Sequence, residues 1–274
     1  MTERTARPAD SAARQGRPGG ASSLGADASF SVHDYQRKIV ALARLLGPKQ
    51  AVGFQKIRIG RSFDGGYILV DDFSGVDAAF SFGVSDDASW DLDIAERRIP
   101  VHQFDHTIDK GPVAHPLITF HKVRIAAADA PGGARLDTLA GRLLANSRKA
   151  ILKIDIEGDE WPVFAAASPA TLDKFSQIVC ELHGFNLLGD PAKYDYPMAV
   201  LTKLKTLFEV VHVHGNNAQP ATNVFNVILP VFLEVTLANR RHYQFAETNE
   251  IFPTPLDQPN LPHLPDLHLG SFKF

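Results

Sequence analysis

Between Ala78 and Leu237, short apolar runs alternate with segments in which apolar residues recur at helical spacing. Short apolar runs bounded by loop residues are typical of strands that are buried on both faces, as in parallel sheets. Chains in which such strands alternate with helices form α/β domains, with helices covering both faces of a mainly parallel sheet. We therefore predict a Rossmann-like α/β domain. The expected strands are Ala78–Phe82, Val101–Phe104, Leu117–Val123, Ala150–Ile154, Gln177–Glu181, Phe208–His214 and Val231–Leu237, and the expected helices are Asp86–Arg98, Leu136–Leu144, Glu160–Ala167 and Tyr196–Leu207.

The segments on either side of this pattern have a different character. Apolar residues at positions 32, 35, 39, 42 and 46 predict a helix that ends at Gly47-Pro48, and Lys56–Ile59 with Gly66–Val70 predict a β-hairpin. Residues 1–29 have almost no large apolar side chain and are expected to be disordered, whereas residues 251–274 carry five prolines and are expected to run extended across the surface. The domain is thus expected over 30–250, with the helix and hairpin in 30–75 and the core in 76–250.

Composition excludes several classes of function. The net charge is −3 and the pI about 6.4, so no basic surface is available to attract nucleic acid or anionic lipid. The single cysteine, Cys180, excludes an intramolecular disulfide, and no apolar run is long enough to span a membrane. We expect a cytoplasmic protein whose partner is a small molecule. The oligomeric state is not predictable from these features.

The loop after the first strand argues against a dinucleotide cofactor. It reads Ser81-Phe82-Gly83-Val84-Ser85-Asp86-Asp87, with one glycine in place of the G-x-G-x-x-G that brings a pyrophosphate close to the backbone. Asp86 and Asp87 would repel a pyrophosphate but tolerate a cationic ligand. An alternative reading is that both acids only serve the start of the next helix.

Ionisable residues follow two other strands, at the edge of the sheet where α/β proteins bind ligands. Asp105 lies about twenty residues past the glycine loop, where an acid can accept both ribose hydroxyls of an adenosine; otherwise it is a solvated loop residue. Lys153, Asp155 and Glu157 alternate at the end of a buried strand and share one face. Such side chains are unfavourable there unless they meet a ligand, a metal or one another.

Several segments resemble those of the FkbM-type methyltransferases, which use S-adenosylmethionine. The most specific is Ile151-Leu152-Lys153-Ile154-Asp155-Ile156-Glu157-Gly158-Asp159-Glu160, and the resemblance spans about residues 56–237. It implies a seven-stranded sheet with an antiparallel last strand, and O-methylation as the reaction. The supporting segments are Arg61–Tyr67, Ser81–Val84, Phe104-Asp105, Glu181-Leu182-His183, His212–Asn217 and Leu233–Thr236.

The resemblance also implies where the cofactor lies. Gly83 would contact its methionine part and Asp105 its ribose, and Ser81 and Asp155 are also expected to bind the cofactor. Asp64, Gly65 and Gly66 would close the pocket from the hairpin, and Asp129 would face the adenine. The chain departs from the family pattern in lacking the second and third glycines of the loop after Phe82.

Methyl transfer to a hydroxyl requires a base or a metal ion to remove its proton. We predict His183 as the base, with Asp155 orienting it or contacting the substrate; His214, at the end of the neighbouring expected strand, is a second candidate. The alternative is a site for Mg, Mn or Fe formed by Asp155, Glu157, Glu181, His183 and His214.

The leading interpretation is therefore an S-adenosylmethionine-dependent methyltransferase that acts on a small hydroxylated acceptor, such as a sugar, a glycan precursor or a secondary metabolite. Two alternatives remain: a methyltransferase-like domain that binds without turnover, and a nicotinamide-dependent oxidoreductase.

Overall fold

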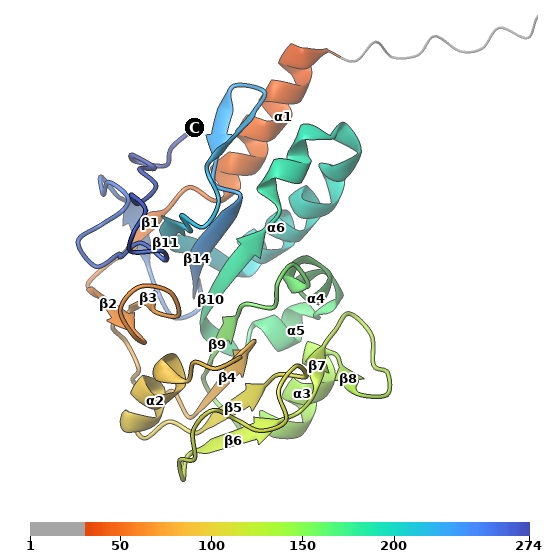
Figure 1. Ribbon diagram of the computed structural model, residues 1–274, viewed down its shortest axis with the longest axis vertical. Coiled ribbons are helices and arrows are strands. Elements are labelled where there is room, and N and C mark those ends of the chain that lie inside the picture. Colours follow the sequence, from red (N-terminus) through yellow and green to blue (C-terminus); the bar gives the residue numbers. More distant parts are fainter. Residues whose placement is uncertain (1–30) are drawn as a thin grey trace, which may run out of the picture. The chain divides into compact units, whose positions relative to one another are not determined.

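Seven strands form one central sheet in the computed structural model, which describes residues 31–274 (Figure 1). The strand order is β11-β14-β10-β9-β4-β5-β6. All strands are parallel except β14, which pairs antiparallel with both β10 and β11. This confirms the mainly parallel Rossmann-like sheet with an antiparallel last strand. The bounds are β4 Ala78–Phe82, β5 Val101–Phe104, β6 Ile118–His121, β9 Ala150–Ile154, β10 Phe175–His183, β11 Phe208–Gly215 and β14 Phe232–Asn239.

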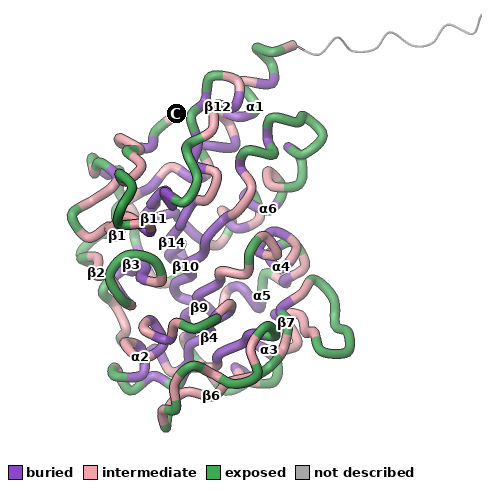
Figure 2. Tube along the Cα trace, in the orientation of Figure 1, coloured by how far each residue is buried: buried purple, intermediate pink, exposed green. Residues whose placement is uncertain are grey.

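The central strands are buried because both faces of the sheet are covered. Every residue of β4 and β9 is buried, and Figure 2 shows the same for most of β10 and β14. One face packs against five helices through a core that includes Phe80, Phe82, Phe164 and Phe175. These helices are α1 Val32–Leu45, α3 Leu136–Leu143, α4 Glu160–Ala166, α5 Pro169–Leu172 and α6 Asp195–Leu207.

The other face of the sheet is covered by the hairpin β2 (Lys56–Ile59) and β3 (Tyr67–Val70), by α2 (Ser89–Glu96) and by parts of the C-terminal segment. Its core joins Trp90 and Ile94 of α2 with Ala79 and Ile151 of the sheet. The predicted helix at 32–46 and the predicted hairpin are both confirmed. Tyr67, on β3, is thereby placed over the carboxyl ends of the central strands.

The helix α2 begins at Ser89, three residues later than predicted. The Asp87 carboxylate accepts hydrogen bonds from the backbone N and from Oγ of Ser89, at 2.9 and 3.0 Å. Ser85 has a left-handed backbone (φ 48°), and its N–H is bound by the Asp105 carboxylate at 2.8 Å. The residues before Ser89 therefore form a loop that is fixed from the neighbouring strand.

Several short pairs of strands were not expected. Three residues are too few to show the period-2 alternation from which strands are predicted. The additional elements are β1 Lys49–Ala51 paired with β15 Phe245–Glu247, β7 Arg124–Ile125 with β8 Gly133–Ala134, β12 Thr222–Val224 with β13 Val227–Leu229, and the 3₁₀ helices η1 Phe185–Gly189 and η2 Pro191–Lys193.

The C-terminal segment, residues 251–274, is attached by polar as well as apolar groups. Phe252 and Phe272 are buried. Asp257 Oδ1 lies 2.8 Å from His212 Nε2, and Asp266 Oδ1 lies 3.0 Å from a second histidine of β11, His214. The segment thus covers the end of the sheet at β11.

The predicted disorder of residues 1–29 lies outside the described residues. Within residues 31–274, no helix is both long enough and apolar enough to cross a membrane.

Candidate functional site

Two cavities lie at the carboxyl ends of the central strands. The first, of about 410 Å³, is lined by the loops after β4, β5 and β9 and by the hairpin loop. The second, of about 660 Å³, lies between the loop after β9, the start of α4 and the loop after β10. Glu157 lines both cavities. This is the edge of the sheet at which ligands bind in α/β domains.

At Gly83 the backbones of the loops after β4 and β9 lie in close contact. The backbone of Gly83 is left-handed (φ 73°), and a Cβ atom there would lie 1.6 Å from the carbonyl oxygen of Asp155. Only glycine fits this contact. The floor of the first cavity is therefore two backbones in contact, with Gly83 and Asp155 on either side.

Asp105 lines the first cavity, but its carboxylate is already well supplied with donors. Oδ2 accepts from the N–H groups of Val84 and Ser85 at 3.0 and 2.8 Å. Oδ1 accepts from the N–H and the hydroxyl of Thr107 at 2.7 and 2.6 Å. Burial would raise the pKa of Asp105, but these hydrogen bonds outweigh it and hold the pKa below its ordinary value. Asp105 is therefore an anion that fixes the loop after β4.

The other expected cofactor residues divide into two groups. Asp64 and Gly65 line the first cavity from the hairpin loop, as does Asp155. Gly66, Ser81 and Asp129 are not among the residues that line it. Ser81 is fully buried beneath the cavity, and Asp129 accepts from the backbone N of Arg135 at 2.9 Å at the start of α3.

A buried polar row supports the floor of the first cavity. Ser81 of β4 pairs in register with Gln103 of β5 and Lys153 of β9, and all three are buried. Lys153 Nζ donates to the carbonyl oxygen of Gly83 at 2.8 Å. Asp91 of α2 is 1% exposed; burial raises its pKa, and attraction to Lys153 offsets part of that rise. The Lys153 ammonium is thus a buried cation among carboxylates.

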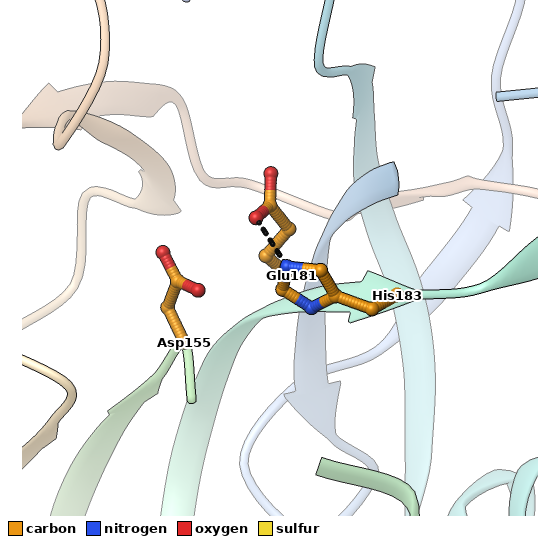
Figure 3. Close-up of side chains that lie close together, drawn as sticks. All are labelled: Asp155, Glu181 and His183. Carbon is orange, nitrogen blue, oxygen red and sulfur yellow. Dashed lines mark ion pairs between the residues drawn. The ribbon is translucent and has the colours of Figure 1, made fainter. Parts of the chain in front are cut away.

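Asp155, Glu181 and His183 come together between the two cavities, and their side chains point toward one another (Figure 3). His183 Nε2 lies 3.0 Å from Glu181 Oε2, and the hydroxyl of Tyr67 donates to Asp155 Oδ2 at 2.8 Å. The second imidazole nitrogen, Nδ1, lies 3.3 Å from Oε2 of the fully buried Glu160. We call Asp155, Glu181 and His183 the junction cluster.

The charges of the junction cluster are strongly coupled. Burial, followed by repulsion from Glu181, raises the pKa of Asp155 to about 7. Burial lowers the pKa of His183, but hydrogen bonds and attraction from Glu160 and Glu181 outweigh it and raise that pKa to about 11. The neighbouring carboxylates therefore favour the protonated imidazole of His183, and burial beside Glu181 favours the protonated form of Asp155.

His214 does not join the junction cluster. Its Nδ1 lies 3.1 Å from Glu234 Oε2, and its Nε2 faces Asp266. Burial lowers the pKa of His214, but attraction from Glu234 and the hydrogen bond to Asp266 raise it to about 10. Glu157 lies at the outer edge of the cluster: its side chain is 89% exposed beyond the end of β9, and its Oε2 lies 3.6 Å from His183 Nε2.

The second cavity is mainly apolar. Its walls include Trp161, Phe185 and Phe232, and the His183 ring lies 4.9 Å from that of Phe232. Leu187, which is 56% exposed, stands at its rim. The cavity therefore suits a molecule with an apolar body that presents a polar group to His183.

Sequence reasoning gave no role to Glu160 or Tyr67. Glu160 Oε1 accepts from Ile156 N at 2.7 Å, and its Oε2 accepts from Gly158 N at 3.0 Å, so it holds the loop as well as the imidazole of His183. A glutamate in the first turn of a helix is normally a helix-dipole residue, so the sequence carried no signal for this role. Tyr67 belongs to the segment Arg61–Tyr67, which resembles the FkbM-type methyltransferases, but its contact with Asp155 arises only when the fold places the hairpin over that residue.

No protein-family model and no curated protein matches this chain. Among solved structures, a putative riboflavin biosynthesis protein from Shewanella sp. PV-4 is 12% identical, with a TM-score of 0.22, over 61% of this chain and 75% of that one. The methyltransferase CalO6 is also 12% identical, with a TM-score of 0.27, over 61% of this chain and 58% of its own. These weak similarities carry no argument about activity. The strand order itself defines the fold, and the likeness to the FkbM-type methyltransferases stays a resemblance of sequence segments.

Proposed function

We propose that this protein is an S-adenosylmethionine-dependent methyltransferase that methylates a hydroxyl group of a small acceptor. The observation that carries the proposal is the charge of the first cavity. Seven carboxylates line it, against the three cations of Arg61, Lys153 and Arg124. Such a surface repels a pyrophosphate and accommodates a sulfonium cation and an ammonium group. The same argument disfavours a nicotinamide dinucleotide.

The cofactor would lie along the first cavity, with its ribose at Asp105 and its sulfonium toward Asp155. Because the Asp105 carboxylate already accepts four hydrogen bonds, the ribose hydroxyls would replace the hydroxyl of Thr107, which is free to rotate away. The backbone donors from Val84 and Ser85 would stay in place. Asp64 and Gly65 would cover the ligand from the hairpin loop.

The acceptor would occupy the second cavity. Its apolar walls suit an aromatic or aliphatic body better than a free sugar, because an apolar wall leaves sugar hydroxyls without partners. The hydroxyl to be methylated would lie beside Glu157 and the junction cluster, where the two cavities meet.

S-adenosylmethionine would supply the methyl group: a lone pair of the acceptor oxygen would bond to the methyl carbon as the electron pair of the C–S bond goes to sulfur. The hydroxyl proton passes to Asp155, whose pKa of about 7 suits a base near neutral pH. The protonated His183 would hold the Glu181 carboxylate in position. His183 as the base, the expectation from the sequence, remains a prediction, and the charges of the site favour Asp155 for that role.

The test is calorimetric titration of the full-length protein with S-adenosylhomocysteine, in parallel with NAD. We expect micromolar binding of the first compound and none of the second. Asp105→Asn should weaken that affinity roughly tenfold or more, in line with the loss of charge-assisted hydrogen bonds. Asp109→Asn is the matched control, because this exposed aspartate lies four residues away and outside the cavity. Binding of NAD alone, or equal affinities for both variants, would overturn the proposal.

A binding domain without turnover is the second candidate, and the single glycine of the loop after β4 favours it. This candidate would be supported if the protein binds S-adenosylhomocysteine but transfers no methyl group to any of a panel of hydroxylated aromatic acceptors. Asp155→Asn tests the base directly: it should retain cofactor affinity and lose turnover.

A further inference from the structure

We infer that the junction cluster binds a divalent cation of the Mn²⁺ class, through Asp155, Glu181 and His183. The inference rests on the proposed function in one respect only, which is that the cation would lie where the acceptor hydroxyl meets the cofactor. Cation binding itself is independent of any activity.

The donor atoms are already gathered. One ligand atom from each of the three residues lies within 4.8 Å of the others, a separation that a single ion can bridge. Asp155 follows β9, and Glu181 and His183 lie on β10, which pairs with β9 in parallel register. Side chains at adjacent strand ends are held by the sheet, so little conformational entropy is lost when an ion binds.

Asp155 supplies an independent sign that a ligand is missing from the cluster. Its Oδ1 atom is buried and has no hydrogen-bond partner among residues 31–274, whereas Oδ2 accepts from Tyr67. Glu181 beside it is 6% exposed. A buried carboxylate oxygen without a partner is unfavourable, because it has lost its hydrogen bonds to water and gained none in the protein. A cation at this place would satisfy it and separate the two carboxylates electrostatically.

Each ligand side chain is also held by a second group, as in metal sites generally. The carboxylate of Glu160 faces His183 Nδ1 and leaves Nε2 directed at the cluster. Asn216 Nδ2 donates to Glu181 Oε1 at 2.7 Å, so Oε2 is the oxygen that faces His183 Nε2, and an ion would bind these two atoms by displacing the proton between them. The remaining residue, Asp155, is held by Tyr67.

The donor set selects the kind of cation. Two carboxylates and one imidazole suit Mn²⁺ and similar first-row ions, whereas Ca²⁺ prefers six to eight oxygens and a closed zinc site needs four protein ligands. Three protein ligands leave coordination positions open. Since Asp155 lines the first cavity and His183 the second, those positions face the space between cofactor and acceptor.

The inference therefore narrows the acceptor class to molecules that present an oxygen donor to the ion. Coordination would lower the pKa of the acceptor hydroxyl. With Asp155 engaged as a ligand, the released proton would pass to Glu157, the solvent-exposed carboxylate that lines both cavities.

The test is titration of the full-length protein, first dialysed against a chelator, with MnCl₂ in the absence of cofactor and acceptor. Loss of the electron paramagnetic resonance signal of free Mn²⁺ reports binding. We expect one ion per chain in the wild-type protein. The isosteric variants Asp155→Asn and Glu181→Gln should each weaken binding more than tenfold, and Glu160→Gln by roughly 10- to 100-fold through His183.

Asp266→Asn is the matched control. His214 with Glu234 and Asp266 forms another group of one imidazole and two carboxylates, but there the two carboxylates face opposite nitrogens of the imidazole, so the three ligand atoms do not converge on one point. This variant should bind Mn²⁺ as the wild-type protein does. Thermal unfolding followed by circular dichroism checks that every variant is folded, and Glu160→Gln serves if a ligand variant is not.

Two outcomes would overturn the inference. One is no binding by the wild-type protein at millimolar Mn²⁺, and the other is equal binding by the wild-type protein and the variants Asp155→Asn, Glu181→Gln and Glu160→Gln. A parallel titration with S-adenosylhomocysteine in the presence of chelator separates the two proposals. Binding of the homocysteine compound without Mn²⁺ binding refutes the cation site alone. If the protein binds Mn²⁺ but does not bind S-adenosylhomocysteine, the proposed function alone is refuted.

Discussion

Replacing Gly83 with alanine tests whether the contact between the loops after β4 and β9 builds the floor of the first cavity. The new Cβ would lie 1.6 Å from the Asp155 carbonyl oxygen and 2.8 Å from its carbonyl carbon. Restoring ordinary van der Waals contact requires the two backbones to separate by roughly 2 Å. Such a movement breaks the bonds from Gly83 N to Phe104 O and from Asp155 N to Phe82 O, both 3.1 Å.

We expect Gly83→Ala to lower the free energy of unfolding by about 3–5 kcal/mol. The left-handed backbone of the alanine contributes about 1–2 kcal/mol, overpacking about 1–3 kcal/mol, and the broken hydrogen bonds the rest. The same movement distorts the floor of the first cavity, so affinity for S-adenosylhomocysteine should fall as well. Urea unfolding followed by circular dichroism, with calorimetry of the folded fraction, measures both effects.

Gly75→Ala is the matched control for this substitution. Gly75 has nearly the same backbone angle (φ 71°), but a Cβ there meets nothing within 4 Å among the described residues. The free energy of unfolding of the Gly75→Ala variant should fall by only about 1–2 kcal/mol, the cost of a left-handed backbone at an alanine. If the free energy of unfolding falls equally in both variants, the close contact of the two backbones at Gly83 does not affect stability, and our account of the cavity floor is wrong.

Three further substitutions test the polar interior. Lys153→Met should destabilise the protein by about 3–5 kcal/mol, because it leaves buried carboxylates without their cation, and adding Asp91→Asn should recover part of that loss in urea unfolding. His214→Asn should destabilise by more than about 1.4 kcal/mol, the equivalent of one pKa unit, at pH 6. Because the folded pKa of about 10 lies above the ordinary 6.5, this difference should be complete below pH 6.5 and vanish as the pH rises through 10; a constant difference would contradict the assignment. Asn260→Ala should cost about 2–3 kcal/mol in the same assay, because its amide donates to two carboxylates, one on the hairpin loop and one on β14, at 3.0 and 2.8 Å.

The sheet could be predicted from the sequence because its central strands are buried on both faces. Ala150–Ile154 is apolar except for Lys153, and its bounds match the prediction. The start of α2 could not be predicted, because it is set by the Asp105 carboxylate, which binds Ser85 N from another strand. The residues next to Ser85 do not indicate that its backbone N–H binds a carboxylate twenty residues further along the chain.

The candidate site was predictable only to the level of the strand ends. Asp155, Glu181 and His183 were expected at one edge, and the structure brings them together. The same reasoning included His214, which faces Asp266 of the C-terminal segment instead. That partner lies 52 residues further along the chain, so no spacing rule connects the two.

The position of β14 between β10 and β11 has a consequence for synthesis of the chain. The two neighbours of β14 are made first and have no pairing with each other, so each presents an open edge until Phe232–Asn239 leaves the ribosome. Unpaired edges of long apolar strands are templates for aggregation. A chain that stops before residue 232 should therefore accumulate in inclusion bodies, and pairing of the final strand completes the sheet of the nascent protein.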